Sequence, residues 1–442
     1  MKFILFAAAI CLLFLSETAA GQSDRIAQHS FSLVAWNSTG FSRPDEVTEI
    51  DLARIKMKFP SFNEKAFFII YLGGNHRKGS FERSNKREEI PSQLSEEPLG
   101  CVGKEVDTAK KIIFICSFAP HEKKKFEVVW KSDTVEKRLY PKMTQAALGV
   151  KVDYRKVNGY YTDGKFVDVD SATVPADHFA HDALYRIEGP GWESDKIVYR
   201  VYMDSRNRND IFGKRTHDLV LHEIGQNDLV SNSKESYANM LDWGMDIFKV
   251  GESLGIGSIA MWHDSKVVTV SDVEQIKCSV FNGAIRSGVS AKYFGWKVGG
   301  GKYDLFSNLS ISARSRLTKV SACMNNDSVQ LCTGLAKHKN CDLIKSRSAA
   351  NVEWAYMALY GRQSLSGDNL GIAVLYRGAD EVELTEDGAS DIVVLRPVAG
   401  RLTYYFGAAW EDEPEGIKNE KEFKKYLDDT VLELSNPIQT YF

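Results

Sequence analysis

The stretch KIVYRVYMDSRN, at positions 196–207, alternates between two kinds of side chain. The apolar positions of one parity are Ile197, Tyr199, Val201 and Met203. The positions of the other parity are mostly polar and are Val198, Arg200, Tyr202, Asp204 and Arg206. Because side chains along a strand alternate between two faces, the stretch predicts a β-strand with one face in a core. The second face is costly to bury unpaired, so it faces either solvent or a shared concave surface.

The preceding segment reads ADHFAHDALYRIE at positions 176–188 and is also expected to be a strand. One of its parities carries His178, Asp182, Arg186 and Glu188, and the other carries His181 and Tyr185. An exposed sheet face covered with ion pairs is one interpretation of these residues. The mixture of Tyr, His and Arg with carboxylates favours the other interpretation, a ligand groove.

Beyond residue 150, short β-branched and aromatic runs follow one another with turn residues between them. The runs expected to be strands are Ser258–Trp262, Lys266–Val270, Cys278–Phe281, Val289–Val298, Tyr303–Ala313, Arg316–Met324, Trp354–Tyr360, Leu370–Tyr376, Asp391–Pro397 and Leu402–Ala409. This pattern predicts an all-β fold with a large antiparallel sandwich over residues 150–442. Apolar residues at helical spacing predict one helix at 419–432, and residues 22–135 are expected to form a small N-terminal β domain.

Residues 1–20 have the pattern of a signal peptide: Lys2, an apolar run, then small residues. The mature chain is therefore expected to be secreted or periplasmic. Six cysteines remain after Cys11 is removed, and an even number in an oxidising compartment favours disulfides. The local pairs Cys101–Cys116 and Cys332–Cys341 are the expected bridges.

The composition, with 43% hydrophobic and 26% charged residues, is that of an ordinary globular protein. A formal net charge of -3 argues against nucleic acid as a partner. No apolar run after the signal peptide is long enough to predict a membrane span. The sequence does not specify an oligomeric state.

Several distinctive motifs lie at Tyr185–Asp195, Tyr199–Asp204, Asn209–Lys214, Asp242–Asp246, Lys249–Gly251, Leu254–Ser258, Tyr293–Trp296 and Tyr404–Trp410. Together they resemble the bacterial family known as domain of unknown function 4861. The resemblance implies a galactose-mutarotase-like β-supersandwich. It also implies a dehydratase acting on uronic-acid-ended oligosaccharides from ulvan-type algal polysaccharide.

Elimination from a uronic acid requires a base, a group that stabilises the enolate, and an acid for the departing oxygen. Tyr and His suit the proton transfers, and Arg suits the carboxylate because its planar fork matches two oxygens. The candidate base is His181 or Tyr202, the candidate carboxylate clamp is Arg200 or Arg206, and the candidate acid is Tyr185 or His178. Within each pair the sequence gives no ranking.

Ten further residues are candidates for substrate binding, because they are polar or aromatic residues in the same region. They are Arg186, Glu188, Trp192, Asp204, Asp210, Lys214, Trp243, Asp246, Lys249 and Trp262. No cofactor or metal is expected, although His178, His181 and Asp182 offer the residue types of a divalent-cation site. The alternatives to a dehydratase are a non-catalytic carbohydrate-binding protein and a glycoside hydrolase using Glu188 and Asp204 as its carboxylate pair.

Overall fold

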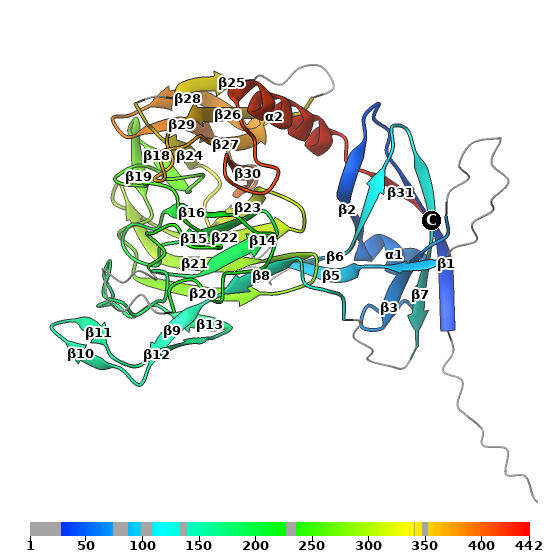
Figure 1. Cartoon of the computed structure of the whole chain (residues 1–442), viewed down its shortest axis with the longest axis horizontal. Coiled ribbons are helices and arrows are strands. Elements are labelled where there is room, and N and C mark those ends of the chain that lie inside the picture. Colours follow the sequence, from blue (N-terminus) through cyan, green and yellow to red (C-terminus); the bar gives the residue numbers. More distant parts are fainter. Residues whose placement is uncertain are drawn as a thin grey trace, which may run out of the picture.

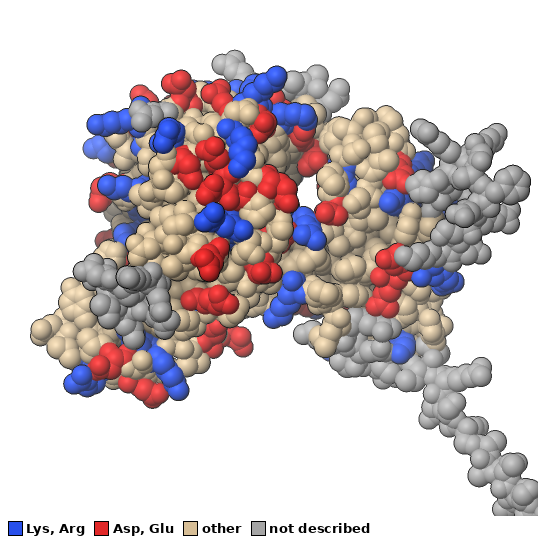
Figure 2. Space-filling model, in the orientation of Figure 1, with Lys and Arg blue, Asp and Glu red and all other residues tan. Residues whose placement is uncertain are grey.

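The computed structural model describes residues 28–73, 87–98, 108–132, 139–226, 236–339, 341–346 and 352–442. The expected signal peptide at 1–20 lies outside these ranges. Figure 1 shows a large β domain on the left, a smaller β domain on the right, and one long helix at the top of the large domain, on the side that faces the smaller one. Lys and Arg are intermixed with Asp and Glu over the visible face of the large domain (Figure 2).

The smaller domain consists of two antiparallel sheets with a short helix between strands β2 and β3. The first sheet has the order β31-β1-β7-β3-β4, formed by β31 (Gln439–Tyr441), β1 (Gln28–Trp36), β7 (Lys123–Lys131), β3 (Phe67–Tyr71) and β4 (Glu88–Ile90). The second has the order β2-β6-β5, formed by β2 (Arg43–Asp51), β6 (Thr108–Phe118) and β5 (Ser92–Pro98). The helix α1 (Leu52–Lys58) was not expected from the sequence.

The two ends of the chain meet in this domain. Strand β31 pairs antiparallel with β1, so that Val34 lies opposite Tyr441. Ile438 is buried in the same apolar cluster as Phe31 and Phe126. The small domain that the sequence predicts at 22–135 is therefore completed by residues from the C-terminus.

The large domain contains one nine-stranded sheet and two five-stranded sheets, all antiparallel. The nine-stranded sheet runs β13 (Ser171–Thr173), β20 (Gln275–Phe281), β21 (Arg286–Val298), β22 (Gly301–Ser312), β23 (Leu317–Met324), β30 (Arg401–Trp410), β27 (Leu370–Arg377), β26 (Trp354–Gly361) and β25 (Asp342–Lys345). One five-stranded sheet runs β17 (Gly244–Asp246), β16 (Asn209–Lys214), β15 (Ile197–Val201), β14 (Gly191–Ser194) and β8 (Thr144–Ala147). The other runs β19 (Lys266–Thr269), β18 (Ala260–His263), β24 (Gln330–Ala336), β29 (Ser390–Leu395) and β28 (Glu381–Glu386). Two strand pairs complete the domain: β9 (Gly149–Val152) with β12 (Lys165–Asp168), and β10 (Arg155–Val157) with β11 (Tyr160–Thr162).

One continuous core joins these three sheets. It includes Trp192 and Tyr199 from one five-stranded sheet, Met261 from the other, and Val289 and Phe406 from the nine-stranded sheet. A core between facing sheets is the arrangement of a sandwich. The predicted all-β fold class is confirmed. Strands β24 and β28 were not predicted.

Strand β15 shows why strand parity is only partly informative. As predicted, Ile197, Tyr199 and Val201 belong to the main core. Val198, from the opposite parity, packs with Ile187 and Leu221 in a second apolar cluster. Loops therefore cover the outer face of this strand, and its polar side chains do not face bulk solvent. The strand ends at Val201, not at Asn207.

The helix α2 (Glu420–Ser435) lies against the outer face of the nine-stranded sheet (Figure 1). Phe423, Leu427 and Val431 bury one side of it against strands β26, β27 and β30. Gly371 permits this contact, since a Cβ there would lie 2.7 Å from the Phe423 ring. The Asn419 side chain caps the helix by accepting a hydrogen bond from the Glu422 N–H. None of the helices that the structure describes is long and apolar enough to span a membrane.

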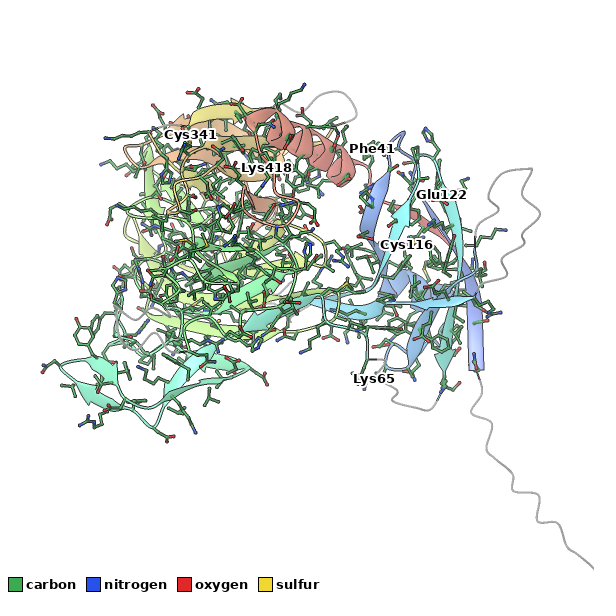
Figure 3. The ribbon with its side chains drawn as sticks, viewed as in Figure 1. Phe41, Lys65, Cys116, Glu122, Cys341 and Lys418 are labelled. Carbon is green, nitrogen blue, oxygen red and sulfur yellow. The ribbon has the colours of Figure 1, made fainter. Side chains whose placement is uncertain are left out.

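The two predicted disulfide pairs are wrong. Cys116, Cys332 and Cys341 are free thiols, as is Cys278. Cys116 and Cys341 lie in different domains (Figure 3). The expected bridge Cys332–Cys341 is not formed, and Cys116 does not pair with Cys101, which lies outside the described residues. The even number of cysteines therefore did not predict which cysteines pair.

Candidate functional site

The candidate site begins with charged residues on three neighbouring strands. Arg200 on β15 lies opposite Asp210 on β16, and Asp246 ends β17 opposite Phe212 of β16. Arg200 Nε and Nη2 lie 3.0 and 2.5 Å from Asp210 Oδ2. Arg200 Nη2 also lies 2.8 Å from Asp246 Oδ2. Sheet register thus places one guanidinium between two carboxylates.

Tyr202 links this group to a second arginine. Its hydroxyl donates to Asp210 Oδ2 at 2.5 Å and accepts from Arg200 Nη2 at 3.2 Å. The guanidinium carbons of Arg206 and Arg200 lie 3.8 and 4.9 Å from the centre of the Tyr202 ring. Cation–π attraction therefore adds to the ionic contacts.

Arg206 binds the carboxylates at the outer edge of this set of charged residues. It binds Asp204 in a bidentate manner, with Nε to Oδ1 at 2.9 Å and Nη2 to Oδ2 at 2.6 Å. Its Nη2 also lies 2.8 Å from Glu188 Oε1. His181 Nδ1 lies 2.6 Å from the same Glu188 oxygen. Burial decreases outward, because the side chain of Arg200 is 3% exposed, Glu188 15% and His181 75%.

We call this set the acid–arginine network and define it by eight residues. They are His181, Glu188, Arg200, Tyr202, Asp204, Arg206, Asp210 and Asp246. One donor at its centre is unsatisfied: Arg200 Nη1 is buried without a hydrogen-bond partner among the described residues. It lies 3.7 Å from Glu188 Oε2. The network therefore connects a buried interior to an exposed histidine.

Burial changes the acid–base chemistry of the network. Burial, and then the neighbouring Asp210 carboxylate, raise the pKa of Asp246 to about 8. Burial also raises the pKa of Tyr202 well above its usual range, and the hydrogen bond to Asp210 acts in the same direction. Asp246 therefore holds a proton more readily than an ordinary carboxyl group, and Tyr202 gives up its proton less readily than an ordinary phenol.

The segment that carries His181 and Glu188 is a series of turns, so the predicted strand at 178–188 is wrong. The segment cannot form a strand because of its backbone conformation. His181, Ala183 and Glu188 have positive φ values of 66°, 65° and 64°. Strand geometry requires negative φ. Asp182 organises the first turn by accepting hydrogen bonds from the N–H groups of Phe179 and Leu184.

The two predicted acids lie in the interior of this segment. His178 Nδ1 lies 2.7 Å from Asp182 Oδ2, and the His178 side chain is 3% exposed. Tyr185 is also buried, with its ring perpendicular to that of His178. Burial raises the pKa of Tyr185 above its usual range. Neither side chain reaches the surface on which His181 lies.

Five of the ten predicted binding residues are in the interior, which removes them from a ligand surface; two of them, Asp204 and Asp210, belong to the acid–arginine network. Trp192 is fully buried and donates from Nε1 to Thr318. Lys214 is fully buried and lies 3.0 Å from Glu193 Oε2. Arg186 is 1% exposed and lies 3.1 Å from Asp168.

The remaining aromatic and basic candidates are more accessible. Trp243 and Trp262 are half-buried, and Lys249 is exposed. Trp243 packs edge-on against Phe212, near Arg200. Sequence reasoning missed Tyr237, whose ring centre lies 5.3 Å from the Arg200 guanidinium. No group of three or more His, Cys, Asp or Glu side chains in the described ranges is arranged to hold a metal ion.

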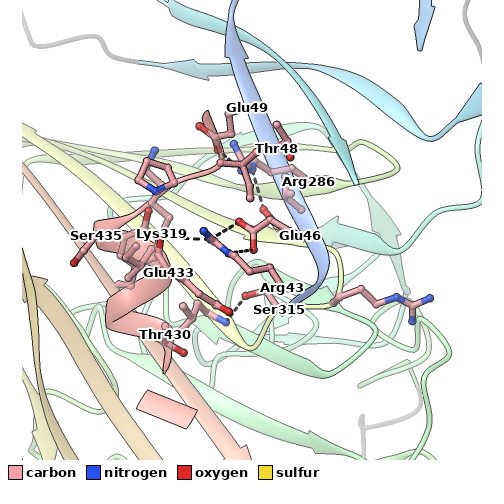
Figure 4. A pocket seen from close by; sticks show the side chains of 18 of the residues that line it. Arg43, Glu46, Thr48, Glu49, Arg286, Ser315, Lys319, Thr430, Glu433 and Ser435 are labelled. Carbon is pink, nitrogen blue, oxygen red and sulfur yellow. Dashed lines mark hydrogen bonds and ion pairs between the residues drawn. The ribbon is translucent and has the colours of Figure 1, made fainter. Parts of the chain in front are cut away.

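A cavity of about 990 Å³ lies elsewhere, between the two domains (Figure 4). Arg286 of the large domain binds Glu49 of β2 at 2.6 Å. Arg43 of β2 binds Glu46 and donates to the carbonyl groups of Asn436 and Glu433. These contacts hold the domains together across the cavity. We place the candidate chemistry in the acid–arginine network, because that network links an exposed histidine to buried carboxyl groups.

The fold and the site define an all-β sandwich protein with a buried ionic network that opens at a histidine. The model of the family described as "Domain of unknown function (DUF4861)" matches residues 36–440. The chain belongs to this family, as its motifs predicted. No curated protein matches the sequence.

The solved structures that are similar share little sequence with this chain. One is a protein in glycosyl hydrolase family 38 from Enterococcus faecalis, with 9% identity and a TM-score of 0.44 over 93% of this chain and 47% of that one. Another is an alpha-mannosidase from Enterococcus faecalis V583, with 8% identity and a TM-score of 0.43 over 93% of this chain and 46% of that one. The chain spans about half the length of these two structures.

Proposed function

We propose that this protein is an exported carbohydrate-active enzyme that removes water from a uronic acid at the non-reducing end of an acidic oligosaccharide. The observation that carries the proposal is that one network contains both an exposed histidine held by a carboxylate and the buried carboxyl group of Asp246. The dehydratases implied by the family resemblance point to the same reaction class.

His181 is the base. Its Nδ1 lies 2.6 Å from Glu188 Oε1, so Nδ1 is engaged by the carboxylate and Nε2 is the ring nitrogen left for a substrate. Because the side chain is 75% exposed, Nε2 is open to a substrate. Tyr202, the other candidate base, is buried and donates its proton to Asp210.

Arg206 is the carboxylate clamp. Its Nε and Nη2 are committed to Asp204 and Glu188, but Nη1 has no hydrogen-bond partner among the described residues. The side chain is 25% exposed. A guanidinium at this place favours the negative charge that develops when the proton alpha to a carboxylate is removed. Arg200 is too deeply buried for direct contact and positions Glu188 and Asp246 instead.

Asp246 is the acid, a role that the sequence gave to Tyr185 or His178. Asp246 is 13% exposed and holds its proton at neutral pH. His181 takes the C5 proton, and the electron pair of the C5–H bond passes into the adjoining carboxylate as an enolate beside Arg206. This pair then forms the C4=C5 double bond as the C4–O bond breaks, and the oxygen leaves as water with the proton of Asp246. Atoms and charge balance without a co-reactant.

The hydrolase alternative is disfavoured by one contact. Glu188 Oε1 and Asp204 Oδ2 lie 2.8 and 2.6 Å from the same Arg206 nitrogen. The guanidinium therefore fills the space that a glycosidic bond would need between the two carboxylates. Asp204 is also 1% exposed, so it does not reach a ligand.

The test is incubation with a panel of uronic-acid-ended oligosaccharides, followed by near-ultraviolet absorbance and mass spectrometry. Loss of one water with the chain length kept is the expected result. His181→Ala should lower turnover by about 10²–10⁴-fold, since a missing proton-transfer group has this cost. The matched control is His217→Ala, another exposed histidine, which should retain full turnover. A shortened product would indicate hydrolysis or chain cleavage. Binding without any product would favour a carbohydrate-binding protein.

A further inference from the structure

Exposed aromatic side chains gather on the hairpin formed by β10 and β11 and on the turn beside it. Tyr154 and Tyr160 are 45% and 49% exposed, and Phe179 is 36% exposed. The rings of Tyr160 and Phe179 are nearly perpendicular, with centres 5.2 Å apart. The hairpin projects from the lower left of the large domain (Figure 1), where uncharged surface borders charged side chains (Figure 2). Grouped exposed aromatics on a projecting element indicate a contact surface.

The hairpin is anchored to the turn that carries the candidate base. The Tyr161 N–H donates to the Asp182 carbonyl at 2.8 Å. Buried Lys151 donates to the Tyr161 carbonyl at 2.7 Å. Lys156 of β10 lies 2.6 Å from Asp177. The exposed rings are therefore held at a fixed position relative to His181.

Chain geometry sets how close these rings lie to the candidate base. Phe179 and His181 are two residues apart, so their Cα atoms are separated by at most about 7.6 Å. Both side chains are exposed, at 36% and 75% respectively. The Tyr160 ring packs edge-on against the Phe179 ring and enlarges the exposed aromatic surface. The exposed aromatic side chains therefore begin two residues from the candidate base.

We propose that Tyr160 and Phe179, with Tyr154 beside them, form a stacking platform for the pyranose rings that follow the reacting uronic acid. The proposal rests on the function proposed above and adds the binding of the adjoining sugars. The rings offer flat apolar surface to the C–H faces of a sugar. The ion pairs Lys156–Asp177 and Arg155–Asp163 border them and offer hydrogen bonds to hydroxyl groups. Aromatic rings bordered by charged side chains suit a sugar chain, which has both C–H faces and hydroxyl groups, better than an apolar protein partner.

The test is direct binding of uronic-acid oligosaccharides of two to six residues, measured by isothermal titration calorimetry with catalytically impaired His181→Ala protein. Adding Phe179→Ala or Tyr160→Ala should weaken binding of the longer chains roughly 5- to 20-fold. The loss should be smaller for the disaccharide, which does not reach the whole platform. Tyr160→Phe should restore binding because the ring remains. Tyr441→Ala is the matched control, because Tyr441 is 49% exposed but lies on β31 in the other domain.

The outcomes separate this inference from the proposed reaction. Weaker binding in the platform variants supports the platform even if the wild-type protein releases no water from any sugar. Dehydration by the wild-type protein, with unchanged binding in Tyr160→Ala and Phe179→Ala, would overturn the platform alone. An equal loss in Tyr441→Ala, or no binding of any oligosaccharide in the panel, would also overturn it. Unchanged circular dichroism and Tm ensure that the variants are folded.

Discussion

The contact between the two domains should weaken as pH rises, because of Glu433 near the end of α2. Burial, and then the nearby Glu46 carboxylate of β2, raise the pKa of Glu433 from 4.5 to about 7. Arg43 acts in the opposite direction and Asp429 in the same direction. Because the folded-state pKa is the higher one, the contribution of Glu433 to stability is fully present below about pH 4.5. It is lost as pH rises through about 7.

The size of the effect follows from the shift. Each pKa unit corresponds to about 1.4 kcal/mol, so the upper limit is about 3 kcal/mol for the displacement from 4.5 to about 7. Glu433 is only partly buried, and solvent screening reduces the expected value to about 1–3 kcal/mol. Glu433→Gln should remove this pH dependence. The variant should match the wild type near pH 4.5 and exceed its stability at about pH 8.

Thermal unfolding followed at several pH values measures this difference. The matched control is Glu420→Gln, an exposed glutamate at the other end of the same helix. Its Tm difference from the wild type should be the same at each pH. A Glu433→Gln difference that does not grow between about pH 4.5 and about pH 8 would refute the reasoning. A wild-type Tm that is higher at about pH 8 than the Tm of the variant would also refute it.

Two further variants test the site and the core. In Asp246→Asn, turnover should fall by about 10²–10⁴-fold because the proton donor is lost, measured as initial rate against pH. Wild-type activity should decline as pH rises through about 8, where Asp246 loses its proton, and this decline should be absent from the residual activity of the variant. Phe423→Ala should destabilise the protein by about 3–5 kcal/mol in urea unfolding, because a buried ring is replaced by a cavity between α2 and the sheet. A loss below about 1 kcal/mol would show that α2 does not depend on this contact.

Much of the fold could be predicted because its signals are local. The runs at 289–298, 303–313 and 402–409 lie within observed strands or within one residue of them, since β-branched and aromatic alternation is visible over a few residues. Strand β31 could not be predicted in the same way. It has three residues, and its pairing with β1 joins opposite ends of the chain. Such a partner is not visible in a local window.

The candidate site was predicted in composition but not in geometry. Arg200, Asp210 and Asp246 were all candidates, yet their meeting depends on the register of three strands. The positive φ values at His181, Ala183 and Glu188 were invisible because these are not glycines. The raised pKa of Asp246 depends on burial and on Asp210 across the sheet, which no spacing in the sequence encodes.

One buried donor of the acid–arginine network, Arg200 Nη1, bears on the proposed ligand site. A network that serves only stability gains from satisfying every buried donor, because each unmet group costs about 1–3 kcal/mol. Arg200 Nη1 is buried without a hydrogen-bond partner among the described residues, although Glu188 Oε2 lies 3.7 Å away. Glu188 is held short of this donor by His181 and Arg206, both of which contact its other oxygen. A small movement of Glu188 as His181 engages a ligand would complete the Arg200 contact. Buried atoms without partners also occur away from the network, for example Arg186 Nε, so the Arg200 donor supports the proposed site only together with the exposed His181 and the half-buried Arg206.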